Sequence, residues 1–165
     1  MKLLSEISDK DRNKNMPKMN VRKAARAVLF DNNLIPLLFV SRYNYHKLPG
    51  GGIKKHESKI NALKRESMEE VGCKIDALQE LGKIIEYRSQ FNLKQTSFCY
   101  SGNIISKGQP NFTKKELSDG FKIIWVTLNK AISILASDEP ANYEGSFIQK
   151  RDLIILKEVK KTLQF

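Results

Sequence analysis

A run of three glycines followed by an acid-rich helical segment, residues 50–72, constrains this chain more than any other feature. Ser58 can cap a helix through its side-chain oxygen. A mostly apolar stripe at helical spacing follows, made up of Ile60, Leu63, Ser67 and Val71. Gly72 comes next, where a left-handed residue commonly ends a helix. We therefore predict a loop at residues 50–52 and a helix over residues 58–71.

Three glutamates lie in the last turns of this predicted helix, Glu66, Glu69 and Glu70. Positions four apart on a helix differ by about 40° in direction and about 6 Å along the axis, so Glu66 and Glu70 can converge. Like charges at this spacing repel by a few tenths of a kcal/mol. A divalent cation would offset the repulsion, because Mg²⁺ prefers oxygen ligands. A solvated face with lysine partners is the alternative, and the glutamates alone do not decide between them.

The same segment resembles the Nudix box, G-x5-E-x7-R-E-U-x-E-E-x-G-U, where U is a bulky aliphatic residue. The matching residues are Gly51, Glu57, Arg65, Glu66, Ser67, Glu69, Glu70, Gly72 and Cys73. Every fixed position is present, and Leu48-Pro49-Gly50 is similar to the usual lead-in. The departures are Ser67 and Cys73 at the aliphatic positions; Cys behaves as a small hydrophobe.

This resemblance implies an α/β fold, an α/β/α sandwich around a mixed sheet. It implies Mg²⁺ or Mn²⁺ ligands at Gly50, through its carbonyl, and at Glu66 and Glu70. Glu69 would bind a second metal ion or orient metal-bound water. Arg65 and Glu57 would fix the carboxylates, and outer partners of this kind typically affect metal affinity or activity 10–100-fold.

The resemblance also implies an activity, the metal-dependent hydrolysis of a phosphoanhydride bond. The expected substrate is a nucleoside diphosphate linked to another moiety, so the expected partner is a small-molecule nucleotide or nucleoside diphosphate derivative. An RNA 5′-end pyrophosphohydrolase is the second candidate, with RNA as the partner. A non-catalytic nucleotide-sensing or nucleic-acid-binding module is the third, although such modules usually lose the metal carboxylates that this chain retains.

Residues outside the box should select the substrate. Arg42 and Arg88 could hold distal phosphates or sugar, and Tyr45 could stack on a base. Each of them could equally be an ordinary surface or core residue. A catalytic base or auxiliary ligand is expected from the polar loop at residues 106–120, with Glu116 as the first choice and Asp119 as the second.

The rest of the chain reads as one mixed α/β domain over residues 21–165, preceded by an arm or short element at residues 1–20. Strands are predicted at residues 21–30, 34–41, 81–88, 96–105 and 121–126, and helices at residues 128–136 and 147–163. The first two strands should form a hairpin around a turn at residues 31–33. Pro36 indicates an edge position or a bulge in the second.

Composition excludes few functions. The formal net charge is +11 in 165 residues, which favours polyanionic partners, but the basic residues are spread along the chain. No apolar run approaches the ~20 residues of a membrane span, and the N-terminus lacks signal-peptide character, so a cytoplasmic location without membrane partners is expected. Cys73 and Cys99 should be reduced core residues, and no zinc spacing occurs. The oligomeric state stays open.

Overall fold

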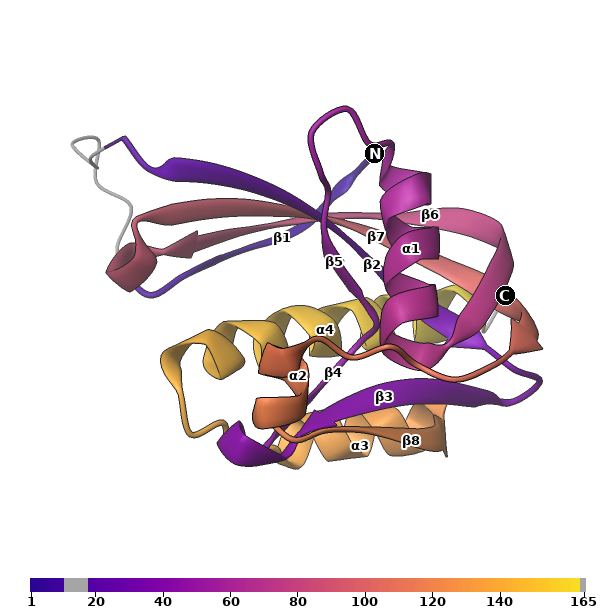
Figure 1. The fold of residues 1–165 in the computed structure, drawn as a ribbon. Coiled ribbons are helices and arrows are strands. Elements are labelled where there is room, and N and C mark those ends of the chain that lie inside the picture. The colour runs from indigo at the N-terminus through magenta and orange to yellow at the C-terminus, as the bar shows by residue number, and fades with distance from the viewer. Residues whose placement is uncertain (11–17, 164–165) are drawn as a thin grey trace.

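Two β-sheets and four α-helices form the structure, a computed structural model that describes residues 1–10 and 18–163 (Figure 1). The larger sheet contains, in spatial order, β1 (Leu3–Ser8), β6 (Cys73–Arg88), β7 (Leu93–Lys107), β2 (Asn20–Phe30) and β5 (Gly50–Gly52). Strand β1 runs parallel to β6 and β2 parallel to β7, whereas β6 with β7 and β2 with β5 are antiparallel. The sheet is therefore mixed, and the α/β class expected from the sequence is confirmed.

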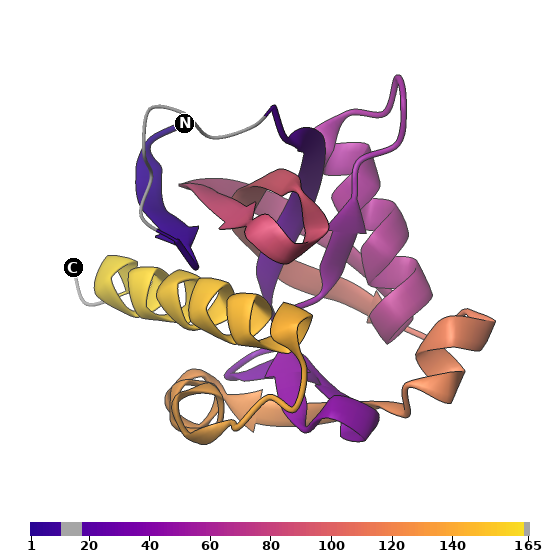
Figure 2. The same cartoon turned by 90° about the vertical axis from the view of Figure 1, so that its left-hand side faces the viewer.

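The smaller sheet is antiparallel and contains β4 (Tyr45–Lys47), β3 (Leu34–Val40) and β8 (Phe121–Thr127) in this order. The helices are α1 (Lys59–Val71), α2 (Lys114–Ser118), α3 (Leu128–Ser137) and α4 (Tyr143–Thr162). Helix α1 packs on one face of the larger sheet, and α4 lies between the two sheets, with α3 beyond the smaller one (Figure 2). Each sheet thus buries its apolar residues against helices.

Strand β2 separates the two sides of the larger sheet, because successive side chains of a strand point to opposite faces. Ala25, Ala27 and Leu29 belong to the core cluster that includes Leu63 and Val71 of α1. Val28 belongs to the other cluster, which includes residues of α3 and α4. The even-numbered positions of β2 therefore face α4, and among them stands a buried arginine, Arg26.

Two local predictions were wrong. Strands β2 and β3 do not form a hairpin: a single bridge between Asp31 and Leu34 closes the turn, after which each strand joins a different sheet. Residues 50–52 are not a loop but strand β5, which pairs with residues 24–26 of β2. The expectation for Pro36 holds only in part: β3 is the middle strand of the smaller sheet, but Pro36 pairs with Trp125 of β8 alone, because the register of β4 begins at Leu38.

Other segments agree closely with the sequence. Helix α1 begins after Ser58, whose side chain accepts a hydrogen bond from the Asn61 amide, and Gly72 follows it with a φ of 69°. The described part of the N-terminal region contributes β1, and residues 11–17 of the predicted arm lie outside the described residues. Cys73 and Cys99 are free and buried. Within the described residues, no helix has the length and apolarity to cross a membrane.

Candidate active site

The glycines of β5 bring the backbone unusually close to a carboxylate of α1. A Cβ atom on Gly51 would lie 2.3 Å from the Glu66 carboxyl carbon, so any side chain there would push Glu66 away. A Cβ atom on Gly50 would lie 2.1 Å from the Ala25 carbonyl oxygen, and Gly50 has a φ of 131°. Glycine is therefore required at Gly50 by the backbone and at Gly51 to keep Glu66 in its place, although both lie in a strand and not in a loop.

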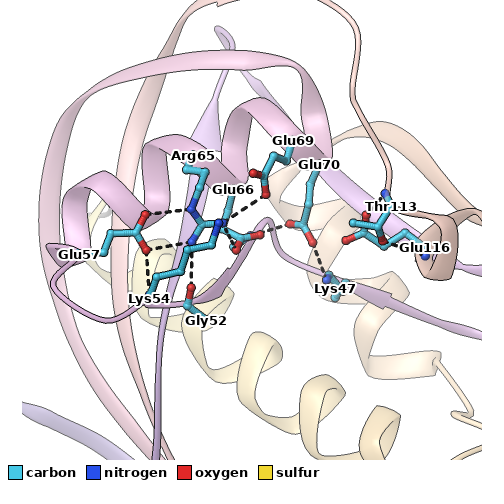
Figure 3. Close-up of polar contacts among 11 residues, drawn as sticks. Lys47, Gly52, Lys54, Glu57, Arg65, Glu66, Glu69, Glu70, Thr113 and Glu116 are labelled. Atoms are coloured by element: carbon cyan, nitrogen blue, oxygen red, sulfur yellow. Dashed lines mark hydrogen bonds and ion pairs between the residues drawn. The ribbon is translucent and has the colours of Figure 1, made fainter.

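Arg65 is the centre of the hydrogen bonds that fix the acidic face of α1 (Figure 3). Its Nε donates to Glu57 Oε1 over 2.9 Å, and its Nη2 donates to Glu57 Oε2 over 3.0 Å and to the Gly52 carbonyl over 2.9 Å. Its Nη1 donates to Glu66 Oε1 over 2.6 Å and to Glu69 Oε2 over 3.2 Å. One guanidinium thus ties together three carboxylates and strand β5.

Glu57 receives a further hydrogen bond, from the Lys54 amide over 2.9 Å. The hydrogen bonds from Arg65, followed by the one from Lys54, lower the pKa of Glu57 to about 2. The hydrogen bonds of Arg65 to Glu57 and to Glu66 raise the pKa of Arg65. Both side chains are therefore fully ionised over the whole neutral range, which suits a fixed frame around the site.

Glu70 lies in a different environment at the end of α1. Its Oε2 accepts a hydrogen bond from the Gly50 amide over 2.8 Å, and its Oε1 accepts one from Lys47 Nζ over 2.7 Å. The side chain of Glu70 is only 2% exposed, and burial raises its pKa despite these donors. A buried carboxylate of this kind is stabilised by any cation that can approach it.

A cleft of about 340 Å³ opens beside these residues. Its acidic lining residues are Glu66, Glu70, Glu116, Asp119 and Glu144. Its basic lining residues are Arg22, Arg26, Lys47 and Lys115, and its aromatic ones are Tyr43, Tyr45 and Phe121. Gly50 and Gly51 also line it. The cleft therefore joins the predicted metal ligands to cations and aromatic rings, which are the groups that a nucleotide needs.

The two acids predicted from the loop at residues 106–120 both reach this cleft. Glu116 belongs to the short helix α2, where its Oε2 accepts a hydrogen bond from the Thr113 amide over 2.7 Å as part of a capping box. Asp119 is nearly buried and pairs with Lys115 over 2.7 Å and with Arg42 over 3.6 Å. The capping bond engages one oxygen of Glu116, and the assignment of Glu116 as a base stays a prediction.

The three predicted substrate-binding residues have different positions. Tyr45 lines the cleft, but Arg42 and Arg88 lie outside the lining that the described residues form. The Arg42 side chain is 56% exposed. Arg88 is buried, with its Nη2 donating to Glu86 Oε1 over 2.8 Å and its Nη1 to Glu144 Oε1 over 3.2 Å. Arg88 therefore lies in the interior, and the structure does not support its predicted contact with substrate.

Sequence reasoning missed Arg22, Arg26 and Lys47, which all line the cleft. A signal existed for the first two, since residues four apart in a strand share a face and both fall within the predicted strand at residues 21–30. Nothing in the sequence indicated that α4 would cover this face. Lys47 lies just before the glycine run, and only the fold brings it to Glu70.

The residues present fit a hard divalent cation, such as Mg²⁺, that keeps some of its water ligands. Among the described residues, no group of three His, Cys, Asp or Glu side chains is close enough to hold a metal ion. Mg²⁺ does not require such a cage, because it commonly binds through one or two carboxylates plus water and substrate phosphates. Glu66 and Glu70 supply two carboxylates at one cleft, and Gly50 lies beside them in β5.

Comparisons with known proteins agree with this geometry. The family model described as NUDIX domain matches residues 20–147. A Nudix hydrolase from Nitrosomonas europaea has a similar fold, with a TM-score of 0.64 and 14% identity over 87% of this chain and 90% of that one. The crystal structure of a MutT Nudix hydrolase from Burkholderia pseudomallei is also similar, with a TM-score of 0.56 and 15% identity over 79% of this chain and 97% of that one. No curated protein sequence matches.

The chain therefore belongs to the Nudix family. It is a hydrolase of the kind that acts on acid anhydrides, and members of this family generally use divalent metal ions and act on nucleoside diphosphate derivatives. Residues 20–147 extend from β2 to the beginning of α4, so the match includes the glycine strand, α1 and every residue that lines the cleft except Ile148.

Proposed function

We propose that this protein is a Mg²⁺- or Mn²⁺-dependent pyrophosphohydrolase of a nucleoside diphosphate linked to a second moiety. The observation that carries the proposal is the convergence of Glu66 and Glu70 on one cleft, beside the glycines of β5. Glu66, Glu70 and the Gly50 carbonyl would hold the cation. A bound cation neutralises the diphosphate, polarises its P–O bond and lowers the pKa of the attacking water.

The chain's own residues have complementary tasks. Arg65 holds Glu66 and Glu69 through its Nη1 and Glu57 through its Nε and Nη2, so that the carboxylates stay in place while substrate enters. Lys47 donates to Glu70 and partly neutralises its charge, and with Glu70 bound to a cation instead, the Lys47 ammonium group would be free to contact a substrate phosphate.

The substrate's organic part has an aromatic wall to pack on. Tyr43 and Tyr45 line the cleft on the side of the smaller sheet; since Tyr45 is only 5% exposed, Tyr43 offers the more accessible ring for a nucleobase to stack on. Glu116 is the proposed base, with Asp119 as the second choice. Removing a proton from the attacking water is worth 10²–10⁴-fold in typical general-base catalysis.

A substrate panel tests the proposal. The wild-type protein is assayed with ADP-ribose, other nucleoside diphosphate derivatives, nucleoside triphosphates and 5′-triphosphorylated RNA, each with Mg²⁺, Mn²⁺ or excess chelator. We expect a nucleoside diphosphate derivative to be cleaved with a metal ion and not with chelator. Glu70→Gln should reduce this turnover at least 100-fold, because it removes a charged ligand of the metal ion.

Two other outcomes would change the assignment. Preferential cleavage of RNA, with a KM that rises steeply with salt, would favour the 5′-end pyrophosphohydrolase. Tight binding of nucleotides without any metal-dependent cleavage across the panel would identify a non-catalytic sensing module and contradict the proposal.

A further inference from the structure

Arg26 is a buried arginine that has no hydrogen-bond partner for two of its nitrogens. It is 5% exposed, and within the described residues neither its Nε nor its Nη1 makes a hydrogen bond. It lines the cleft and is the direct register partner of Gly50, next to the proposed metal ligands. Burying a charged group without a partner is unfavourable, so a buried arginine with unpaired nitrogens at a cleft raises the question of what it binds.

The acids around Arg26 are already engaged by other donors. Glu70 accepts from Lys47 Nζ and the Gly50 amide. Asp152 of α4 accepts from Arg151 Nε over 2.7 Å and from the Leu48 amide over 2.8 Å. Glu86 of β6 accepts from Arg88 and, over 2.8 Å, from Gln95. These carboxylates act on Arg26 through space, but within the described residues its Nε and Nη1 have no hydrogen-bond partner.

The other two buried arginines of this region also have nitrogens without a hydrogen bond among the described residues, Arg88 Nε and Arg151 Nη1 and Nη2, but each of these arginines pairs with carboxylates. Arg88 donates to Glu86 and Glu144, and Arg151 pairs with Asp152 and, over 3.5 Å, with Glu86. Arg26 differs from both in facing the cleft instead of a carboxylate. Burial lowers its pKa to about 10, so the guanidinium is still charged at neutral pH.

We propose that Arg26 is an anion-binding residue of the cleft and receives phosphate oxygens of the bound substrate. This inference rests on the proposed function, and it assigns a second cationic contact to the diphosphate besides the metal ion. A guanidinium suits this role because its planar set of donors matches two phosphate oxygens at once. Arg22 and Lys47 line the same cleft and add positive charge around the anion.

The position of Arg26 indicates that it contacts a phosphate group close to the metal ligands and not a more distant part of the substrate. Arg26 pairs with Gly50 across the β2–β5 ladder, while the proposed ligands Glu66 and Glu70 approach the same strand from α1. An anion between them would be held by the cation on one side and by Arg26 on the other. The aromatic rings of Tyr43 and Tyr45 then remain for the rest of the substrate.

Binding of α,β-methylene-ADP, a diphosphate that cannot be hydrolysed at that bond, tests the inference. Its dissociation constant is measured by calorimetry with Mg²⁺ for the wild type, Arg26→Met and Arg26→Lys. The matched control is Lys150→Met, which removes one positive charge from the exposed face of α4. We expect Arg26→Met to bind at least tenfold more weakly, Arg26→Lys to be intermediate and the control to be unchanged.

Thermal unfolding without ligand separates this role from a purely structural one. Removal of an unpaired buried charge should leave the Tm of Arg26→Met unchanged or higher, whereas Arg151→Met should lower it, because Asp152 then loses its partner. Unchanged analogue binding by Arg26→Met would overturn the inference, and so would a lowered Tm in a folded variant. Should Arg26→Met fail to fold, the inference is likewise overturned unless Arg26→Lys folds and binds more weakly.

Failure of the proposed function gives a different pattern. Mn²⁺ binding in the absence of nucleotide should be the same in Arg26→Met and the wild type. The wild type could bind no metal ion but still bind inorganic pyrophosphate in the presence of chelator, with weaker binding by Arg26→Met. That result would support the anion site and contradict the metal-dependent hydrolase. If the wild type binds neither the analogue nor pyrophosphate, the anion site is wrong.

Discussion

Glu57 and Glu70 are both held by cationic side chains next to one helix, yet their carboxylates behave in opposite ways. Hydrogen bonds from Arg65 lower the pKa of Glu57 to about 2, while burial raises the pKa of Glu70. Glu57 is saturated by a bidentate arginine and an amide. Glu70 has a single lysine and one amide in a buried position beside a cleft. The first arrangement builds a frame, and the second leaves a carboxylate that gains from a further cation.

Within the frame around Glu57, the largest effect is expected from Arg65→Lys. Lysine keeps the charge but lacks the planar donors that reach Glu57, Glu66 and Gly52 together. We expect turnover to fall 10–100-fold, because the carboxylates are no longer fixed. Steady-state kinetics at saturating Mg²⁺ measure this. Unchanged turnover would mean that Arg65 is not needed to position the site.

A smaller effect is expected for the contribution of Glu57 to stability, which should depend on pH. The pKa of Glu57 is lowered on folding, so its stabilising contribution is fully present above its ordinary value of 4.5 and is lost as the pH falls toward 2. Glu57→Gln should therefore reduce the free energy of unfolding at pH 7 by on the order of 1 kcal/mol, since the pair is partly solvated.

Urea unfolding of both proteins at pH 7 and pH 3 measures this difference. The difference in unfolding free energy between wild type and Glu57→Gln should be smaller at pH 3, where Glu57 of the unfolded chain is protonated. A gap that is equal at both pH values would show that the Arg65 contact is not an ion pair that matters for folding.

How far the sequence predicted these features depended on how local they were. The cap at Ser58, the apolar stripe and Gly72 all act within one helix, and α1 was predicted to within a residue of its bounds. The metal-site candidates Glu66 and Glu70 followed from helical spacing and from the resemblance to the Nudix box. Both kinds of signal lie in a short, continuous segment.

Features that depend on distant partners were missed. Glycine is a poor strand former, so residues 50–52 gave no sign that they pair with β2. The turn at residues 31–33 was recognised, but β3 pairs with β8, which comes much later in the chain. Arg88 was predicted to bind substrate or to be an ordinary residue, and Arg26 was not singled out, because the sequence did not show that α4 covers this side of the larger sheet.

Mn²⁺ binding followed by electron paramagnetic resonance tests the central claim most directly. Wild type, Glu57→Gln and Glu70→Gln are titrated with Mn²⁺ in the absence of nucleotide. If Glu70 is a metal ligand and Glu57 part of the frame, Glu70→Gln should weaken Mn²⁺ binding the most, at least tenfold, and Glu57→Gln less. Equal Mn²⁺ affinity in wild type and Glu70→Gln would contradict the assignment of Glu70 and, with it, the proposed metal site.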